Sequence, residues 1–425
     1  MTEYPLLGER VDWRTLACGL TVAVVPRPGF TKKLAYFVTD YGSVDTDWIL
    51  EGTHHRSAAG VAHYLEHKLF DLPDRDVSAQ FGALGASVNA FTSFDMTAYY
   101  FSCSEHFEPC LRLLLEFVST PYFTPESVKK ELGIIRQEIA MTADNPDSRV
   151  FENLMTGMYR SHPVRVPILG TAESIGEITP EMLTRCHRAF YAPGNMLLCV
   201  VGDVDPDEVA ALADAVLGTE PRTPGKASRN WIEDMTCPQS LVEARMEVSM
   251  PMFQLGFKAE PLGRGREAVR QELIGDLAAE ALFGESSELY LQLYEEGVID
   301  SSFGGGLETV TGMALLTVSG DSREPERIRQ ALLDQAARLV RSGIPEEEFL
   351  RMKRSAMGRR IRDLDSFDTT CFRLCAYFFT DFDYFTFPDL YQQIQEADLL
   401  AFLERVVTPE RCCLSVIYPI QEEAV

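Results

Sequence analysis

The sequence predicts an α+β protein built from two similar halves. Its 425 residues are enough for two domains, each with its own packed core. Both halves run through strands, a long helix, further strands and more helices, which indicates a duplicated unit of about 210 residues. A stretch rich in Pro, Gly and charge lies near the middle, at residues 218–230. We therefore expect an N-terminal domain at 1–220, a linker at 221–232 and a C-terminal domain at 233–425.

Short-range patterns predict the elements of the first half. Runs of β-branched and aromatic residues predict strands, and apolar residues at helical spacing predict helices. The expected strands are Leu20–Pro26, Leu34–Thr39, one or two within Ser87–Phe101, and Leu197–Val201. The expected helices are Ala59–Phe70, Val77–Leu84, Glu108–Ser119, Glu126–Thr142 and Val209–Val216.

The second half repeats this order after the linker. Strands are expected within Val242–Phe257, within Ile299–Ser319 and at Cys412–Tyr418. The expected helices are Arg266–Phe283, Glu324–Ser342, Glu346–Asp363 and Asp398–Val407.

Composition excludes several classes of partner. The chain has 39 Lys and Arg against 64 Asp and Glu, a formal net charge of −25. Such a balance repels nucleic acids and anionic membrane surfaces. No apolar run approaches the roughly 20 residues that a membrane span needs. We therefore expect neither nucleic acid nor membrane as a partner.

The cysteines and the N-terminus predict a cytoplasmic protein. Ten cysteines are scattered without a C-x-x-C pair, and most fall in apolar runs, as buried free thiols do. Cys371 and Cys375 could share a metal, but without a neighbouring His they are better explained as core residues. The first residues lack the basic and apolar regions of a signal peptide.

The segment His63-Tyr64-Leu65-Glu66-His67 is the strongest chemical signal. It reads H-x-x-E-H, the inverse of the H-E-x-x-H zinc-protease signature. On a helix, His63 and His67 lie on one face and can bind one metal ion. Glu66 shares that face and is placed to hold a proton beside a metal-bound water.

A catalytic zinc normally takes three protein ligands, so two histidines require a third. The helix Glu126–Thr142 offers Glu131 and Glu138, which lie two helical turns apart on one face. Spacing alone leaves open whether either glutamate is a ligand or both are solvated surface residues.

These residues belong to a wider resemblance. The segment from Ala59 to His67 resembles the G-x-A-H-F-L-E-H segment of the pitrilysin/insulinase metallopeptidases, family M16. Later segments that also resemble the family are Gly85–Thr92 (G-x-x-x-N-A-x-T), Glu131–Glu138 (E-x-x-x-x-x-x-E), Pro167–Thr171 and Phe190–Met196. The similarity runs through most of the chain and is densest between residues 20 and 205.

The resemblance implies a zinc-dependent metalloendopeptidase that cleaves short or unfolded polypeptides. His63, His67 and Glu138 would bind one Zn²⁺ per chain, Glu66 would be the general base, and Glu131 would hold the site from behind the ligands. Two homologous domains would form half of a clamshell. Asn89 and Ala90 would lie on an edge strand, to which a peptide adds through main-chain hydrogen bonds.

One segment departs from the family pattern. Many members carry an Arg and a Tyr in the second half that hold the substrate carbonyl, but this chain has Tyr294 and Asp300 at those positions. The stretch around them is similar to the zinc-bearing chain of paired bacterial proteins that are associated with the aminopentanol modification of elongation factor P. A sister chain with the Arg/Tyr pair would then complete the site, so we expect a homodimer or a heterodimer.

Two other functions remain open at this point. The chain could be a non-catalytic peptide-binding or assembly subunit of an M16-like heterodimer, although such subunits usually lose motif residues that this chain keeps. It could also be a processing factor for one dedicated precursor, which would use the same chemistry.

Overall fold

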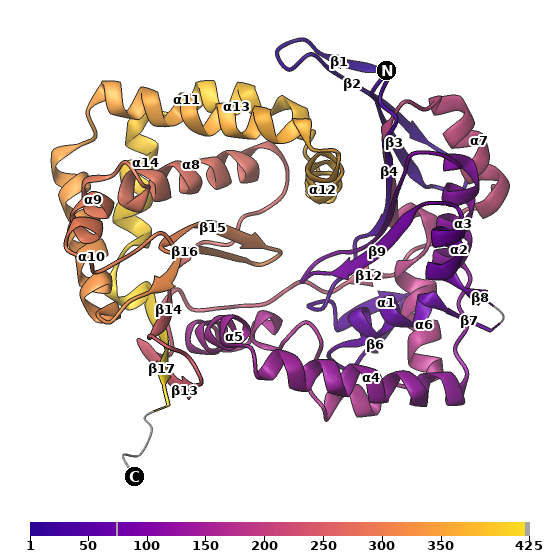
Figure 1. Ribbon diagram of the computed structural model, residues 1–425, viewed down its shortest axis with the longest axis horizontal. Helices are drawn as coiled ribbons and strands as arrows, with labels where there is room; N and C mark the ends of the chain where they lie inside the picture. The colour runs from indigo at the N-terminus through magenta and orange to yellow at the C-terminus, as the bar shows by residue number, and fades with distance from the viewer. Residues whose placement is uncertain (74, 421–425) are drawn as a thin grey trace. The chain divides into compact units, whose positions relative to one another are not determined.

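The computed structural model describes residues 1–73 and 75–420, which form two compact units (Figure 1). Neither unit is one continuous segment. Unit 1 contains Met1–Ile139, Val166–Arg229 and Ile361–Thr386. Unit 2 contains Ala140–Arg165, Asn230–Arg360 and the chain from Phe387 onward. Each unit mixes helices with a sheet, which confirms the predicted α+β class.

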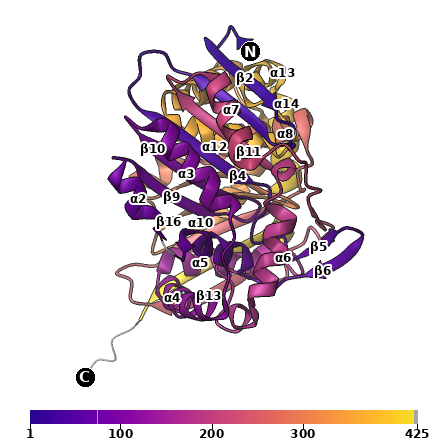
Figure 2. The ribbon, with the colours of Figure 1, turned by 90° about the vertical axis from the view of Figure 1, so that its right-hand side faces the viewer.

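Unit 1 is built on a seven-stranded sheet in the order β1-β2-β3-β11-β4-β10-β9. β3 and β11 pair in parallel, and the other neighbours are antiparallel. The strands are β1 (Thr2–Tyr4), β2 (Glu9–Thr15), β3 (Thr21–Pro26), β4 (Lys33–Thr39), β9 (Ser87–Thr92), β10 (Thr97–Cys103) and β11 (Met196–Gly202). The predicted stretch Ser87–Phe101 thus folds as two strands, and β9 is an edge of the sheet (Figure 2). β1 and β2 are additional strands, whose charged residues obscure the pattern of alternation.

Helices cover both faces of this sheet. Those that share a core on one face are α1 (Val61–Phe70), α2 (Val77–Ala83), α3 (Phe107–Ser119), α6 (Pro180–Phe190) and α7 (Pro206–Leu217). Leu198 and Val200 of β11 point into that core. Cys199 lies between them and therefore faces the other side, where α12 (Phe367–Phe378) packs against β4 and β11.

Unit 2 is built on a five-stranded sheet in the order β13-β17-β14-β16-β15. Its strands are β13 (Leu241–Met246), β14 (Met252–Ala259), β15 (Gly304–Val310), β16 (Met313–Asp321) and β17 (Cys412–Pro419). Its helices include α5 (Pro146–Met158), α8 (Gly265–Phe283), α9 (Glu288–Glu295), α10 (Pro325–Ser342), α11 (Glu346–Arg362), α13 (Phe387–Gln393) and α14 (Glu396–Val406). Across the described residues of both units, no helix is both long and apolar enough to span a membrane.

The units differ from the predicted domains 1–220 and 233–425 by two segments. α5 precedes the predicted boundary, yet it packs against β13, β14 and β17 of unit 2. Gly157 permits this approach, because a Cβ there would lie 2.6 Å from Cys413 Sγ. α12 follows the boundary, yet it belongs to unit 1. Composition locates a linker between domains, but it does not reveal which sheet a helix will cover.

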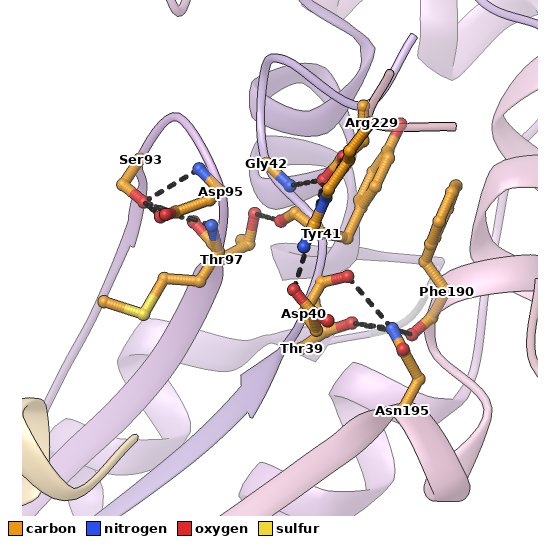
Figure 3. Close-up of polar contacts among 12 residues, drawn as sticks. Thr39, Asp40, Tyr41, Gly42, Ser93, Asp95, Thr97, Phe190, Asn195 and Arg229 are labelled. Atoms are coloured by element: carbon orange, nitrogen blue, oxygen red, sulfur yellow. Dashed lines mark hydrogen bonds and ion pairs between the residues drawn. The ribbon is translucent and has the colours of Figure 1, made fainter. Parts of the chain in front are cut away.

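The predicted linker 221–232 is attached to unit 1 through its middle. β12 (Lys226–Ala227) pairs with β5 (Asp47–Leu50), which forms a hairpin with β6 (Thr53–Arg56). Arg229 then donates to Asp45 from Nε at 2.7 Å and from Nη2 at 2.8 Å, and to Asp40 at 2.8 Å (Figure 3). The Asp45 side chain is buried, so loss of Arg229 would leave an unpaired buried carboxylate. The linker is therefore not a free tether.

Candidate metal centre

Helix α1 presents the two histidines of the H-x-x-E-H segment. The helix begins after Gly60, which has φ 91°. A Cβ at Gly60 would lie 2.5 Å from the Leu169 carbonyl oxygen, so both the conformation and the close approach require glycine. His67 lies four positions after His63, and their ring centroids lie 4.6 Å apart. His63 is buried and His67 is partly exposed. The two rings lie on one helical face, as their spacing predicts.

Helix α4 (Pro125–Ala143) places two glutamates against these rings. Glu138 Oε1 lies 3.6 Å from His63 Nε2, and Glu138 Oε2 lies 3.4 Å from His67 Nε2. Glu131 Oε1 lies 2.9 Å from His67 Nδ1, the other nitrogen of that ring. The two glutamates therefore differ in role, because Glu138 faces both histidines and Glu131 contacts one of them from behind.

Contacts between the histidines and the glutamates shift the pKa values of His67 and Glu138. Burial lowers the pKa of His67, but the adjacent carboxylates of Glu131 and Glu138 outweigh burial and raise that pKa to about 10. The adjacent imidazoles of His63 and His67 hold the pKa of Glu138 far below its usual value. With Glu131 as acceptor, His67 carries a proton on Nδ1. In the neutral ring, the lone pair then lies on Nε2, which faces Glu138.

The three inner side chains fit a metal ion. His63, His67 and Glu138 each offer a ligand atom, and these atoms all lie within 4.8 Å of one another. Ligands about 2.0–2.1 Å from a tetrahedral zinc lie roughly 3.3–3.4 Å apart, close to the measured 3.6 and 3.4 Å. His63 Nδ1 and Glu138 Oε2 are also buried without a hydrogen-bond partner among the described residues. Buried polar atoms without a partner are uncommon, and a cation between the three groups would satisfy Glu138.

Glu66 lies beside this group on α1 and contacts the edge strand β9. Thr92, the last residue of β9, donates a hydrogen bond from Oγ1 to Glu66 Oε2 at 2.6 Å. Both side chains are partly exposed. The carboxylate is thus held near the histidines without being sealed from solvent.

Asn89 and Ala90 lie on β9, the edge strand, as predicted. Asn89 pairs with Tyr100 of β10, and Ala90 pairs with Tyr99. The Ala90 amide donates at 2.9 Å to the side-chain oxygen of Asn89. That amide therefore points away from β10, toward the open edge, where an added strand could bind it.

Tyr294 and Asp300 have local contacts within unit 2. Tyr294 lies on α9, is half exposed and stacks on Tyr290 with ring centroids 5.9 Å apart. Asp300 accepts hydrogen bonds from the amide and the hydroxyl of Ser302. Neither side chain provides the cation or the phenol that the family pattern has at the equivalent position.

The remaining candidates have mostly structural roles. His54 is exposed and His55 stacks on Trp48, and both lie on β6, which pairs with β5. Cys371 and Cys375 are buried core residues, as expected. Sequence reasoning missed Thr92 as a partner of Glu66, although Thr92 ends the G-x-x-x-N-A-x-T segment.

Comparisons with known proteins relate the chain to M16 peptidases. The family model described as insulinase, peptidase family M16, matches residues 48–172, and the model described as the peptidase M16 inactive domain matches residues 177–356. The uncharacterized zinc protease YmfH of Bacillus subtilis (strain 168) is 36% identical over 424 residues, which cover 98% of each chain.

Solved structures show the same fold. The crystal structure of an M16-like peptidase from Alicyclobacillus acidocaldarius matches with a TM-score of 0.93 and 33% identity, over 99% of this chain and 100% of that chain. A protease from Helicobacter pylori matches with a TM-score of 0.82 and 19% identity, over 97% of this chain and 100% of that chain. The second likeness concerns the fold alone.

Proposed function

Since this chain belongs to peptidase family M16, we propose that it is a zinc-dependent endopeptidase that hydrolyses peptide bonds in short or unfolded polypeptides. The observation that carries the proposal is the convergence of His63, His67 and Glu138 from two helices, with Glu66 beside them. The names of relatives support it, because several are called zinc proteases.

His63, His67 and Glu138 would hold one Zn²⁺. Two neutral imidazoles and one carboxylate are a common set for catalytic zinc, and three protein ligands leave a position open. Bound zinc supplies a Lewis acid that polarises a peptide carbonyl and lowers the pKa of water. Glu131 keeps the His67 proton on Nδ1, so that Nε2 remains available as a ligand.

Glu66 would move the proton of the reaction. Its carboxylate lies on the same helical face as the histidines, one residue before His67. We assign it to take a proton from the attacking water and return it to the leaving amine, as a general base and then a general acid. Hydrolysis needs both transfers, and a single partly exposed carboxylate can perform them in turn.

β9 would bind the substrate as an added strand. Its outer edge has no neighbouring strand in the described sheet, and the Ala90 amide is bound only by the adjacent Asn89 side chain. A peptide carbonyl could replace the Asn89 oxygen on that amide, while Asn89 binds the peptide main chain. Recognition through main-chain groups suits a peptidase that accepts many sequences.

We further propose that a partner chain completes the site and that the protein acts in the cytoplasm as a homodimer or heterodimer. Tyr294 and Asp300 replace the Arg and Tyr that hold the substrate carbonyl in many family members. A sister subunit with that pair, as in the paired bacterial proteins linked to elongation factor P modification, would supply it. The ten free cysteines suit a reducing compartment.

Peptide hydrolysis by the purified chain tests the proposal. Zinc-loaded wild type, Glu66→Gln and the control Glu208→Gln, an exposed helix residue, are compared on a library of fluorescence-quenched peptides. We expect cleavage by wild type and the control, and a loss of at least about 100-fold in kcat for Glu66→Gln. Cleavage that appears only after a candidate sister chain is added would indicate a shared site.

Bound zinc without cleavage under either condition would instead favour the non-catalytic peptide-binding subunit. This second function is favoured by one observation, that Tyr294 and Asp300 stand where many family members have an Arg and a Tyr. Peptide binding without turnover, measured by fluorescence anisotropy, would then be its positive test.

A further inference from the structure

We infer that Thr92 is a positioning residue for Glu66, an inference that rests on the proposed function. The Thr92 hydroxyl donates to Glu66 Oε2 at 2.6 Å. No other described residue donates a hydrogen bond to this carboxylate. The contact therefore fixes one oxygen and leaves Oε1 to take up and return a proton.

The contact is better suited to orientation than to stability. Glu66 and Thr92 are both partly exposed, so water could satisfy either side chain if the other were absent. A hydrogen bond that exchanges freely with water contributes little to folding. A flexible glutamate has several rotamers, however, and proton transfer requires the one that points at the reacting atoms. A fixed donor on a neighbouring strand selects that rotamer.

Thr92 is itself held firmly. It is β-branched, which restricts its side chain, and its backbone pairs with Thr97 at the start of β10. The turn that follows is bound by the loop after β4, since the amides of Ser43 and Val44 donate to the carbonyls of Ser93 and Phe94 at 3.1 and 3.0 Å.

The loop after β4 is held in turn by an ion pair between the partly exposed Arg229 and the buried Asp45. Gly42 lies so close to this turn that a Cβ there would be 2.3 Å from the Asp95 amide nitrogen. The Gly42 amide donates to Asp45, and Arg229 binds the same carboxylate (Figure 3). Successive contacts within unit 1 thus connect the Arg229–Asp45 ion pair to the turn that follows Thr92, the donor to Glu66.

The position of Thr92 also links the peptide edge to the base. Ala90 and Thr92 are two residues apart, so their side chains lie on the face of β9 that packs toward the core and α1. The same short strand therefore carries the main-chain edge and the donor that orients Glu66. A peptide added to β9 would be in fixed register with the carboxylate.

Three variants test this role. Thr92→Val keeps the shape but removes the hydroxyl, and Thr92→Ser keeps the hydroxyl. Thr184→Val is the matched control, because Thr184 is exposed on α6 and its hydroxyl bonds only the Pro180 carbonyl nearby. Steady-state kinetics on the quenched peptides, zinc content, thermal unfolding and the Kd for a peptide hydroxamate are measured for each. A carboxylate beside the metal accepts the hydroxamate proton, so this Kd reports on Glu66 without turnover.

For Thr92→Val, we expect kcat to fall about 10- to 100-fold and hydroxamate affinity about 10-fold, with KM within about 3-fold. Its zinc content and stability should match wild type, and Thr92→Ser should recover most of the activity. The inference is overturned if Thr92→Val behaves like Thr184→Val, or if it loses zinc or unfolds early. If wild type cleaves no peptide, either alone or with a candidate sister chain, the proposed function fails, and the hydroxamate affinities still decide the role of Thr92.

Discussion

Unit 1 and unit 2 each bring charged groups of two helices together, and they balance those charges in different ways. In unit 1, α1 and α4 meet through His63, His67 and Glu138, and buried atoms of this group lack hydrogen-bond partners among the described residues. In unit 2, α8 and α11 meet through carboxylates and guanidinium groups that bind one another. The comparison separates a group that could accept an external cation from one whose cations are the chain's own arginines.

The contacts in unit 2 pair three acids of α8 with two arginines of α11. Arg360 Nη2 lies 3.2 Å from Glu272 Oε1 and 2.7 Å from Asp276 Oδ2. Arg359 Nη2 lies 2.9 Å from Glu280 Oε2. A guanidinium is permanently charged, so these acids need no metal. Under the proposed function, His63 and His67 are neutral when they bind the metal, so the metal would supply the positive charge that balances Glu138.

Removing the third ligand should have the largest effect. Structural zinc sites bind with about 10–16 kcal/mol over four ligands, so one ligand is worth roughly 3–4 kcal/mol, or about 100- to 1,000-fold in affinity. We expect Glu138→Gln to weaken zinc binding by this factor, measured by competition with a chromogenic chelator. Glu126→Gln, an exposed residue of the same helix, is the control. Unchanged affinity in Glu138→Gln would place the third ligand elsewhere.

Removing the Arg360 ion pairs should lower the stability of unit 2 without changing the affinity for zinc. Arg360→Met leaves Glu272 and Asp276 without this guanidinium, so unit 2 should lose about 3 kcal/mol. Urea titration followed by hydrogen exchange in β15 and β16 measures this loss. The exposed Arg354→Met is the control. Zinc affinity should remain that of wild type, and a parallel loss of zinc would show that the two helix pairs are not independent.

Replacing Glu131 should weaken zinc binding less than replacing Glu138, because Glu131 contacts the outer nitrogen of His67. Glu131→Gln removes the charged acceptor of the His67 Nδ1 proton, and outer partners of this kind are worth about 10- to 100-fold in metal affinity. The same chelator competition measures it. An effect equal to that of Glu138→Gln would mean that Glu131 binds the metal directly.

Each unit also contains a buried histidine, and this predicts a pH dependence. His187 in unit 1 contacts the Val118 carbonyl, and His162 in unit 2 contacts the Thr311 carbonyl. Burial lowers the pKa of both residues, and that of His187 falls to about 4 although the Val118 hydrogen bond opposes the shift. An unfolded histidine has a pKa near 6.5. Between these values the unfolded chain binds a proton that folded His187 does not.

The contribution of His187 to the stability of unit 1 should therefore be complete above pH about 6.5 and fall as the pH is lowered toward 4, by about 2 kcal/mol at pH 5. The fluorescence of Trp13 and Trp48 in a Trp231→Phe background follows unfolding of unit 1. His187→Gln should remove this pH dependence, and the exposed His54→Gln should keep it. If the stability of unit 1 still falls between pH 6.5 and 4 in His187→Gln, another group causes the pH dependence.

Local patterns predicted many of the elements. α1 and α4 were expected within two residues of their observed ends, because their apolar spacing and the Pro125 and Asp144–Pro146 signals depend only on neighbouring residues. α12 was not predicted, although Phe367, Thr370, Cys371 and Leu374 follow helical spacing and are buried. No local pattern predicts that α12 packs against β4 and β11 of unit 1.

For the site residues, too, the sequence predicted what depends on local spacing and left the rest open. The spacing of His63, Glu66 and His67 fixed their common face, since a helix repeats every 3.6 residues wherever it lies. The spacing of Glu131 and Glu138 identified both as candidates but left their roles open. Resemblance to the family separated the two roles, and the structure gives each glutamate a different nitrogen to contact.

The sequence by itself determined the α+β class, the metal-binding pattern on α1 and the two candidate glutamates on α4. Only the tertiary structure decided that Thr92 contacts Glu66, that Arg229 attaches the linker to Asp45, and that α5 and α12 each pack with the other half of the chain. The physical reason is distance along the chain. Helical periodicity orients side chains a few residues apart, whereas contacts between residues 26 to 184 positions apart depend on how whole elements pack.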